Sequence, residues 1–249
     1  MTQWHAREQP DSLGENEVHL WIVSLADASQ QLSYFTSILS ADEKERVRRF
    51  RKISDRKRYV VARGLLRRFL GRYGAGAPDR LQFTYNAFGK PSLFSAEPQT
   101  VLNFSVSHSE DQALFGFARG RRIGVDLEYV RPDINVVGLA RSYFSPDEFR
   151  RFSCLRASEQ CVAFYRGWTR KEAYLKALGE GLSFGIDRVE VTFLPHEPAM
   201  LNKVFGMPGG SENWTLKDLL LAPSYLGAAA VEGRSVTFKS SQLIDRSLQ

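Results

Sequence analysis

The chain has 249 residues, of which 43% are hydrophobic and 25% are charged, and this composition is ordinary for a soluble globular protein. Its length allows one large domain or two of about 100–150 residues. The polar, mixed-charge N-terminus excludes a signal peptide, and the apolar stretch 219–231 is too short to span a bilayer. Cys154 and Cys161 lack a CxxC or metal-binding spacing, so we expect reduced thiols in a cytoplasmic protein.

The net charge is +6, and many of the basic residues are concentrated in the first half of the chain. Between positions 44 and 58 these are Lys44, Arg46, Arg48, Arg49, Arg51, Lys52, Arg56, Lys57 and Arg58. Such a concentration favours a partner that carries phosphate or acidic groups. Charge alone leaves nucleic acid, a nucleotide cofactor and an acidic protein open, and a solvated helix face is the alternative for individual residues.

In chain order, the first half begins with an apolar run of strand length at 18–25. Ser40 and Glu43 form a capping box that opens a basic helix, and a second helix follows over about 55–73. A Gly-Lys-Pro turn lies at 89–91, and further strands are expected at 81–85, 101–107 and 113–118.

The second half repeats this order. A strand is expected at 123–130, Ser145 opens a second capping box, and a helix over about 161–178 ends at Gly179. Later strands are expected at 189–193, 213–220 and 225–231.

Three pairs of landmarks are separated by the same 105 positions: Trp21 and Asp126, Ser40 and Ser145, Gly74 and Gly179. We therefore predict an α+β fold with two similar halves, residues 1–119 and 120–249, related by a pseudo-twofold duplication. The active site is expected in the cleft between them, since ligand pockets favour such interfaces. A monomer is expected because one chain supplies both walls of the cleft.

Asp126 and Glu128 lie two positions apart on the strand 123–130, so their side chains share one face. Two neighbouring anions repel each other unless a cation joins them, and all-oxygen ligands suit Mg²⁺. A solvent-facing acidic strand is the alternative. Glu172 and Lys176 lie four apart on the late helix, so their side chains share one face. They form a surface ion pair, or Glu172 is a third metal ligand or a base while Lys176 binds phosphate.

His108 lies among small hydroxyl residues at a strand end, where it is either structural or a phosphate contact. No G-x-S-x-G context surrounds it, which argues against Ser/His nucleophilic catalysis.

Four motifs occur in the order and approximate spacing found in phosphopantetheinyl transferases: F-G-K-P at 88–91, F-S-V-S-H-S at 104–109, G-V-D-L-E at 124–128 and W-T-R-K-E-A-Y-L-K at 168–176. The chain resembles the larger, two-half type of this family, similar to the surfactin-synthetase activator. The resemblance implies Mg²⁺-dependent transfer of 4′-phosphopantetheine from coenzyme A to a serine of an apo acyl, peptidyl or aryl carrier protein, with release of adenosine 3′,5′-bisphosphate.

The resemblance also implies roles for individual residues. Asp126, Glu128 and Glu172 would bind Mg²⁺, while Glu172, Lys176 and Asp126 would be catalytic. Contacts to coenzyme A are implied for Arg46, Arg58, Gly89, Lys90, Pro91, Ser107, His108, Lys171 and Lys176. Ser105 departs from the family, which often has Asn at that position.

A surface for the carrier is expected just past the metal-binding strand, at Arg141, Tyr143, Phe144 and Arg150, because the resemblance implies an acidic and apolar carrier face.

Two other functions compete. A basic nucleic-acid-binding protein would use the stripe 44–72 but leaves the carboxylates unexplained, whereas another Mg²⁺-dependent phosphotransferase or nuclease fits the carboxylates but lacks a P-loop. We expect neither nucleic acid nor membrane as a partner.

Overall fold

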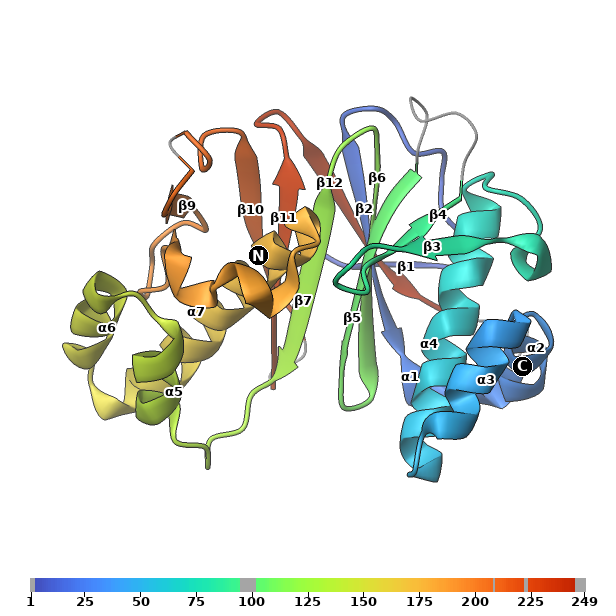
Figure 1. Cartoon of the computed structure of the whole chain (residues 1–249), viewed down its shortest axis with the longest axis horizontal. Coiled ribbons are helices and arrows are strands. Elements are labelled where there is room, and N and C mark those ends of the chain that lie inside the picture. Colours follow the sequence, from blue (N-terminus) through green and yellow to red (C-terminus); the bar gives the residue numbers. More distant parts are fainter. Residues whose placement is uncertain (1–2, 95–101, 208, 222–223, 245–249) are drawn as a thin grey trace.

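The computed structural model describes residues 3–94, 102–207, 209–221 and 224–244. The predicted α+β fold is confirmed: two mixed helix-and-sheet halves lie side by side, with their strands in the middle and most helices outside (Figure 1). Within the described ranges, none of the helices combines the length and apolar composition needed to cross a bilayer. Cys154 and Cys161 are free thiols, as expected.

The first half contains a five-stranded sheet. Its order is β1 (His5–Arg7), β12 (Thr237–Leu243), β2 (Glu17–Ser24), β6 (Gln112–Arg119) and β5 (Leu102–Ser109). Strand β12 runs parallel to both of its neighbours, so the end of the described chain returns to the sheet of the first half. Residue 101, where β5 was expected to begin, lies outside the described residues.

Helices and a hairpin accompany this sheet. They are α1 (Leu25–Ala28), α2 (Leu32–Ser37), α3 (Ala41–Arg49), α4 (Ile53–Arg72) and the hairpin of β3 (Phe83–Tyr85) with β4 (Pro91–Leu93), with 3₁₀ turns at Ser29–Gln31 and Pro78–Arg80. Helix α3 begins with the predicted capping box, in which the Ser40 N–H donates to Glu43 at 2.9 Å. Helix α4 packs on the sheet through an aromatic core that includes Trp21, Phe69 and Phe115.

The second half has a three-stranded sheet in the order β10 (Trp214–Leu220), β11 (Tyr225–Glu232) and β7 (Ile123–Tyr129). Its other elements are α5 (Val136–Tyr143), α6 (Pro146–Ser153), α7 (Ala157–Leu178), 3₁₀ turns at Gly181–Phe184 and Ile186–Arg188, and the pair β8 (Val189–Val191) with β9 (Leu201–Val204). The second capping box is confirmed at the start of α6, where Glu148 accepts from the Ser145 N–H at 2.9 Å. Seven elements in the described ranges have no counterpart among the predicted ones because they are short or weakly patterned: α1, α2, α5, β1, β4, β9 and β12.

The two halves share their element order and strand pairing. Strands β2, β6 and β5 are antiparallel neighbours in the first half, as are β7, β11 and β10 in the second. In each half a capped short helix precedes a long one, α3 before α4 and α6 before α7. This arrangement is consistent with the duplication, which stays a prediction, as does the boundary at residues 119 and 120.

Strand β7 joins the halves through its two faces. Ile123, Val125 and Leu127 enter an apolar layer that they share with β2 and β6 of the first half. The opposite face turns to α7, and Gly124 allows the helix to approach closely. A Cβ atom at Gly124 would lie 1.9 Å from the carbonyl oxygen of Ala173. The glycine therefore sets the distance between strand and helix, and with it the spacing of their polar side chains.

We predict that G124A lowers the free energy of unfolding by at least about 1–3 kcal/mol, because the added methyl group forces α7 away from β7. The measurement is thermal or denaturant unfolding. G14A is the matched control, since a Cβ there meets only the flexible Glu17 side chain at 3.3 Å. Equal stability of G124A and G14A would contradict the close packing.

Candidate functional site

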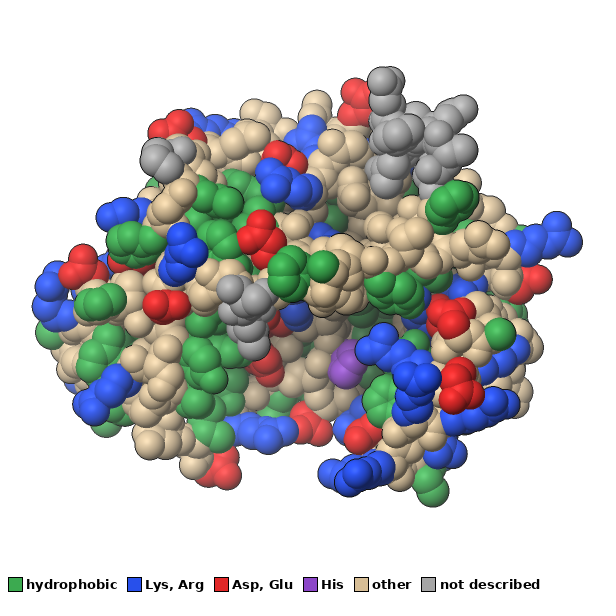
Figure 2. Space-filling model, in the orientation of Figure 1, with side chains coloured by type: hydrophobic (Ala, Val, Ile, Leu, Met, Phe, Trp, Pro, Cys, Tyr) green, Lys and Arg blue, Asp and Glu red, His purple; other side chains and the backbone are tan. Residues whose placement is uncertain are grey.

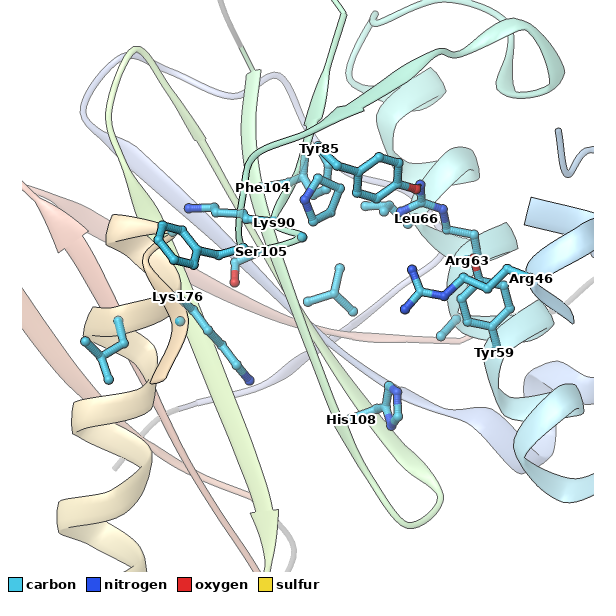
Figure 3. A pocket seen from close by; sticks show the side chains of 18 residues that line it. Arg46, Tyr59, Arg63, Leu66, Tyr85, Lys90, Phe104, Ser105, His108 and Lys176 are labelled. Atoms are coloured by element: carbon cyan, nitrogen blue, oxygen red, sulfur yellow. The ribbon is translucent and has the colours of Figure 1, made fainter. Parts of the chain in front are cut away.

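A cavity of about 370 Å³ lies between the two halves, a size common for ligand pockets. It is bounded by α4, the β3–β4 hairpin, β5 and the C-terminal end of α7 (Figure 3). Lys and Arg side chains gather on the side of the molecule formed by α3 and α4 (Figure 2). The cleft predicted from the sequence therefore exists, and it is cationic along one wall.

Acidic side chains from β7 and α7 meet beside this cavity. The predicted alternation is correct, because Asp126 and Glu128 both face α7 while their neighbours enter the apolar layer. The Lys176 ammonium donates to Asp126 Oδ1 at 2.6 Å and also lines the cavity. The structure therefore brings Asp126, Glu128 and Lys176 together, as predicted, and Glu172 lies one helical turn from Lys176.

Two carboxylate oxygens of this cluster, Asp126 Oδ2 and Glu172 Oε1, are buried without a hydrogen-bond partner in the described part of the chain. A buried acceptor of this kind costs about 1–3 kcal/mol when it stays unpaired. The two unpaired oxygens therefore lower the stability of the fold, and they are able to bind a proton or a cation.

Burial and neighbouring carboxylates raise the pKa of Glu172 and of Glu128. Burial, and then the charges of Asp126 and Glu128, raise the pKa of Glu172 from 4.5 to about 7, although the Lys176 ammonium opposes the shift. The pKa of Glu128 is also raised, by burial and then by Asp126. Glu172 can thus exchange a proton near neutral pH.

Lys176 and Ser107 complete the contacts of Asp126. The Ser107 hydroxyl donates to Asp126 Oδ1 at 3.0 Å and accepts from the Lys176 ammonium at 2.9 Å. The Ser107 hydroxyl is buried and also accepts from the Leu127 N–H at 3.2 Å, and its predicted contact to coenzyme A stays a prediction.

The far end of the cavity combines cations with aromatic rings (Figure 3). The Arg46 guanidinium lies 5.4 Å from the centre of the Tyr59 ring. Arg63 lies 3.9 Å from the centre of the Phe83 ring and donates to the Tyr85 hydroxyl at 2.7 Å. Such an end suits a group that is both anionic and planar. The structure places Arg46 where the sequence expected a coenzyme A contact.

The β3–β4 hairpin closes the cavity and binds the end of α7. Lys90 donates to the carbonyl oxygen of Ala177 at 2.9 Å, and the Asn86 amide donates to that of Gly179 at 2.6 Å. Gly179 ends α7 with φ 81°, the left-handed conformation that glycine favours. Burial, and then Arg122, lower the pKa of Lys90 to about 8. Gly89, Lys90 and Pro91 all line the cavity, at the position the sequence predicted.

His108 and Arg58 lie toward the open side of the site. His108 lines the cavity, and its pKa is lowered by partial desolvation and then by the charges of Lys176 and Arg58. Arg58 is not among the residues that line this cavity. It pairs with Asp111 at 3.2 Å and with Glu110 at 3.5 Å, so its predicted phosphate contact would require it to leave these acids.

Comparison with known proteins decides the family. A family model described as the 4′-phosphopantetheinyl transferase superfamily matches residues 122–230, and a model of the N-terminal part of a 4′-phosphopantetheinyl transferase matches residues 26–116. The chain is 35% identical over 230 residues to 4′-phosphopantetheinyl transferase HetI of Nostoc sp., covering 92% of this chain and 94% of the relative. The chain belongs to the 4′-phosphopantetheinyl transferase superfamily. The family predicted from the four motifs is therefore confirmed.

More distant relatives of this transferase are also found. The chain is 28% identical over 157 residues to 4′-phosphopantetheinyl transferase Sfp of Bacillus subtilis, covering 63% of this chain and 67% of the relative. Among solved structures, an ACPS–CoA complex of Chronobacterium ammoniagenes aligns with 46% of this chain and 98% of that chain, at 18% identity and a TM-score of 0.31. That score is too low to support an argument about shape.

The residues of this transferase fit Mg²⁺ by their chemistry. In the part of the chain that the structure describes, no group of three or more His, Cys, Asp or Glu side chains is already arranged to hold a metal ion. Mg²⁺ needs only one or two protein carboxylates when phosphates and water complete its shell. The unpartnered oxygens of Asp126 and Glu172 supply such ligands.

The prediction for Lys171 is corrected by the structure. Lys171 is fully buried and donates to Glu148 at 2.5 Å and to the carbonyl oxygens of Tyr143 and Ile186. All three ammonium hydrogens are thus engaged away from the cavity, so Lys171 does not reach a phosphate there. It stabilises the junction of α6 and α7 instead. Phe144, predicted on the carrier surface, is likewise buried, in an aromatic cluster with Phe152 and Phe193.

Sequence reasoning missed Arg63, Asn86, Ser109 and Trp168. Arg63 continues the basic run. No pattern in the sequence indicates that Arg63 lines the cavity and that Arg58 lies outside it. Asn86 precedes the Gly-Lys-Pro turn by three residues, a position typical of side chains that hold a loop. Ser109 and Trp168 lie inside the recognised motifs, where they received no role of their own.

We predict that E172Q stabilises the metal-free protein at pH 8 by about 1–3 kcal/mol and has little effect at pH 4.5. A carboxyl whose pKa is raised by folding, here from 4.5 to about 7, lowers stability as the pH rises through that interval. The neutral amide does not carry this cost. Thermal unfolding in EDTA at both pH values measures the difference. An equal effect at both would contradict the raised pKa.

Proposed function

We propose that the chain is an Mg²⁺-dependent enzyme that transfers 4′-phosphopantetheine from coenzyme A to a serine of an apo carrier protein, releasing adenosine 3′,5′-bisphosphate. Membership of the family supports this activity. The observation that carries the mechanism is one cavity with a carboxylate–lysine cluster at one end and cationic, aromatic side chains at the other.

The cavity suggests how coenzyme A would lie. Its adenosine 3′-phosphate would meet Arg46 and Arg63, and the adenine would contact the hairpin at Gly89 and Pro91. The pyrophosphate would then lie near His108 and Lys176, beside the carboxylates. The pantetheine arm would extend from there into solvent, where a carrier can approach.

Residues of this chain would move the proton and offset the developing charge. The carrier serine attacks the β-phosphate of coenzyme A, and adenosine 3′,5′-bisphosphate leaves with the electrons of the broken P–O bond. Glu172 would take the serine proton as the general base. Its pKa of about 7 is that of the metal-free carboxyl, and a cation bound to Glu172 lowers it. Lys176 stabilises the charge on the transferring phosphate. Bound Mg²⁺, held by Asp126, Glu172 and Glu128, would offset the charge of the pyrophosphate.

The proposal includes the partners expected from the sequence. Apo acyl, peptidyl or aryl carrier domains are the protein substrates. The chain is expected to act as a cytoplasmic monomer, which the two free thiols and the cavity walls from a single chain support.

For the carrier surface we retain Arg141, the half-buried Tyr143 and Arg150, and remove the buried Phe144. Both arginines are exposed on neighbouring helices of the second half, although Arg150 pairs with Asp147 at 2.9 Å. Arg141 also lies 5.4 Å from the centre of the Phe149 ring. These side chains offer an acidic carrier both charge and apolar contact.

We predict that R141E/R150E raises KM for the carrier by about tenfold and leaves KM for coenzyme A unchanged. The control R48E/R80E makes the same charge change at exposed sites of the first half. Steady-state kinetics at two salt concentrations measure the effect. An unchanged KM for carrier in the double variant would exclude this docking surface.

The competing functions explain less. Nucleic-acid binding would use the exposed basic face of α3 and the start of α4, but it gives no role to the buried carboxylate cluster. A general Mg²⁺-dependent phosphotransferase would use the carboxylates, but the matched family specifies which group is transferred.

We predict that a carrier protein incubated with the chain, coenzyme A and Mg²⁺ gains the mass of one phosphopantetheine, and that EDTA prevents the gain. D126A and E172A should lower turnover at least about 100-fold, since each removes a proposed ligand of the cation, and E172A also removes the proposed base. Intact-protein mass spectrometry measures the product. Turnover near the wild-type level in either variant would refute the site, and absence of coenzyme A binding would refute the function.

A further inference from the structure

Side-chain hydroxyls of β5 bind the backbone of β7 at every second residue. Ser105 accepts from the Val125 N–H at 3.0 Å, Ser107 from the Leu127 N–H at 3.2 Å and Ser109 from the Tyr129 N–H at 3.0 Å. Strand β5 is the edge of the first sheet, and β7 is the edge of the second. The serines of F-S-V-S-H-S therefore fix the register of one half against the other.

Two of these hydroxyls also hold a carboxylate. Ser107 donates to Asp126 Oδ1 at 3.0 Å, and Ser109 donates to Glu128 Oε2 at 3.3 Å. A serine hydroxyl has lone pairs that accept a hydrogen bond and one proton that it can donate. Each of these two hydroxyls accepts from an N–H of β7 and donates its own proton to the carboxylate of the residue that comes one position earlier on β7. Ser105 has no acidic neighbour at the equivalent place, since residue 124 is glycine.

Glu128 is held from both halves. Its Oε2 accepts from Ser109 of β5, and its Oε1 accepts from the Trp168 indole N–H on α7 at 3.3 Å. Trp168 is itself fixed by the Tyr143 ring, whose centre lies 4.9 Å away in an edge-on arrangement. Neither Ser109 nor Trp168 lines the cavity.

We propose that Ser109 and Trp168 are positioning residues that fix both oxygens of Glu128 in the orientation used to bind the divalent cation. The inference rests on the proposed function. Each carboxylate oxygen keeps a second lone pair for a cation after accepting one hydrogen bond. Such outer contacts commonly change metal affinity or activity by about 10–100-fold.

The test compares S109A with S109T and S105A. S109A should weaken Mn²⁺ binding, titrated by electron paramagnetic resonance at saturating coenzyme A, by about tenfold or more. It should lower kcat while KM for coenzyme A stays within about twofold. S109T keeps the hydroxyl and should restore both values toward wild type. S105A removes the equivalent contact to the β7 backbone but no carboxylate contact, and the contacts from Ser107 and Ser109 remain, so its Mn²⁺ affinity should stay near wild type. Because Ser105 also lines the cavity, only Mn²⁺ affinity is compared for this variant.

The outcomes separate this inference from the proposed function. If the wild-type chain neither binds coenzyme A nor transfers phosphopantetheine, the proposed function fails and the inference falls with it. If wild type is active and S109A matches it in Mn²⁺ affinity and kcat, the inference alone is overturned. Equal loss of Mn²⁺ affinity in S105A and S109A would show a purely structural role, and would also overturn it.

A second variant covers the case in which S109A does not fold. W168F removes the indole N–H from Glu128 and keeps an aromatic ring against Tyr143. It should fold and show the same pattern, a weaker Mn²⁺ affinity and lower kcat with little change in KM for coenzyme A. Wild-type Mn²⁺ affinity in folded W168F would contradict the proposal.

Discussion

The hydroxyls of Ser105, Ser107 and Ser109 accept alternate N–H groups of β7, and much of the site depends on this contact. A strand has two faces, and β7 uses one for the apolar layer between the sheets. Its other face must then carry Asp126 and Glu128 toward α7. Because hydrogen bonds with serine fix the register, a slip by one residue would bury the carboxylates among aliphatic side chains and lose the site.

The close contact of α7 with β7 brings charged side chains together, and this costs folding free energy. Three carboxyl groups and one ammonium lie together in a buried to half-buried cluster, and among the described residues two of the carboxylate oxygens have no hydrogen-bond partner. The apolar layers around the cluster offset this cost, since each fully buried large apolar side chain contributes about 1.5–3 kcal/mol. Burial, and then repulsion from Asp126 and Glu128, lower stability and raise the pKa of Glu172, and this suits the site to a cation or a proton.

Residues that lie 105 positions apart, one in each half, have different roles. The capping-box residues Glu43 and Glu148 are both buried, and each forms an ion pair with the following long helix. Glu43 pairs with Arg63 and, at 2.7 Å, with Arg67, and Glu148 pairs with Lys171 at 2.5 Å. This shared ion pair explains why Lys171 is structural. By contrast, Trp21 fills the core of the first half where Asp126 serves the site of the second. In the proposed site, the first half would thus supply the binding wall, and the second half would supply the carboxylates and Lys176.

Local patterns in the sequence determined the order of the long strands and helices, both capping boxes and the common face of Asp126 and Glu128, because these depend on neighbours within a few residues. The four motifs determined the family. Only the tertiary structure decided that Lys176 reaches the carboxylates while Lys171 does not, although both lie on one helix. Helical spacing gives the angle between two side chains, but the rotation of α7 is set by its packing against Gly124 and its end by the hairpin from the other half. Those contacts join residues far apart in the chain, and no local pattern encodes them.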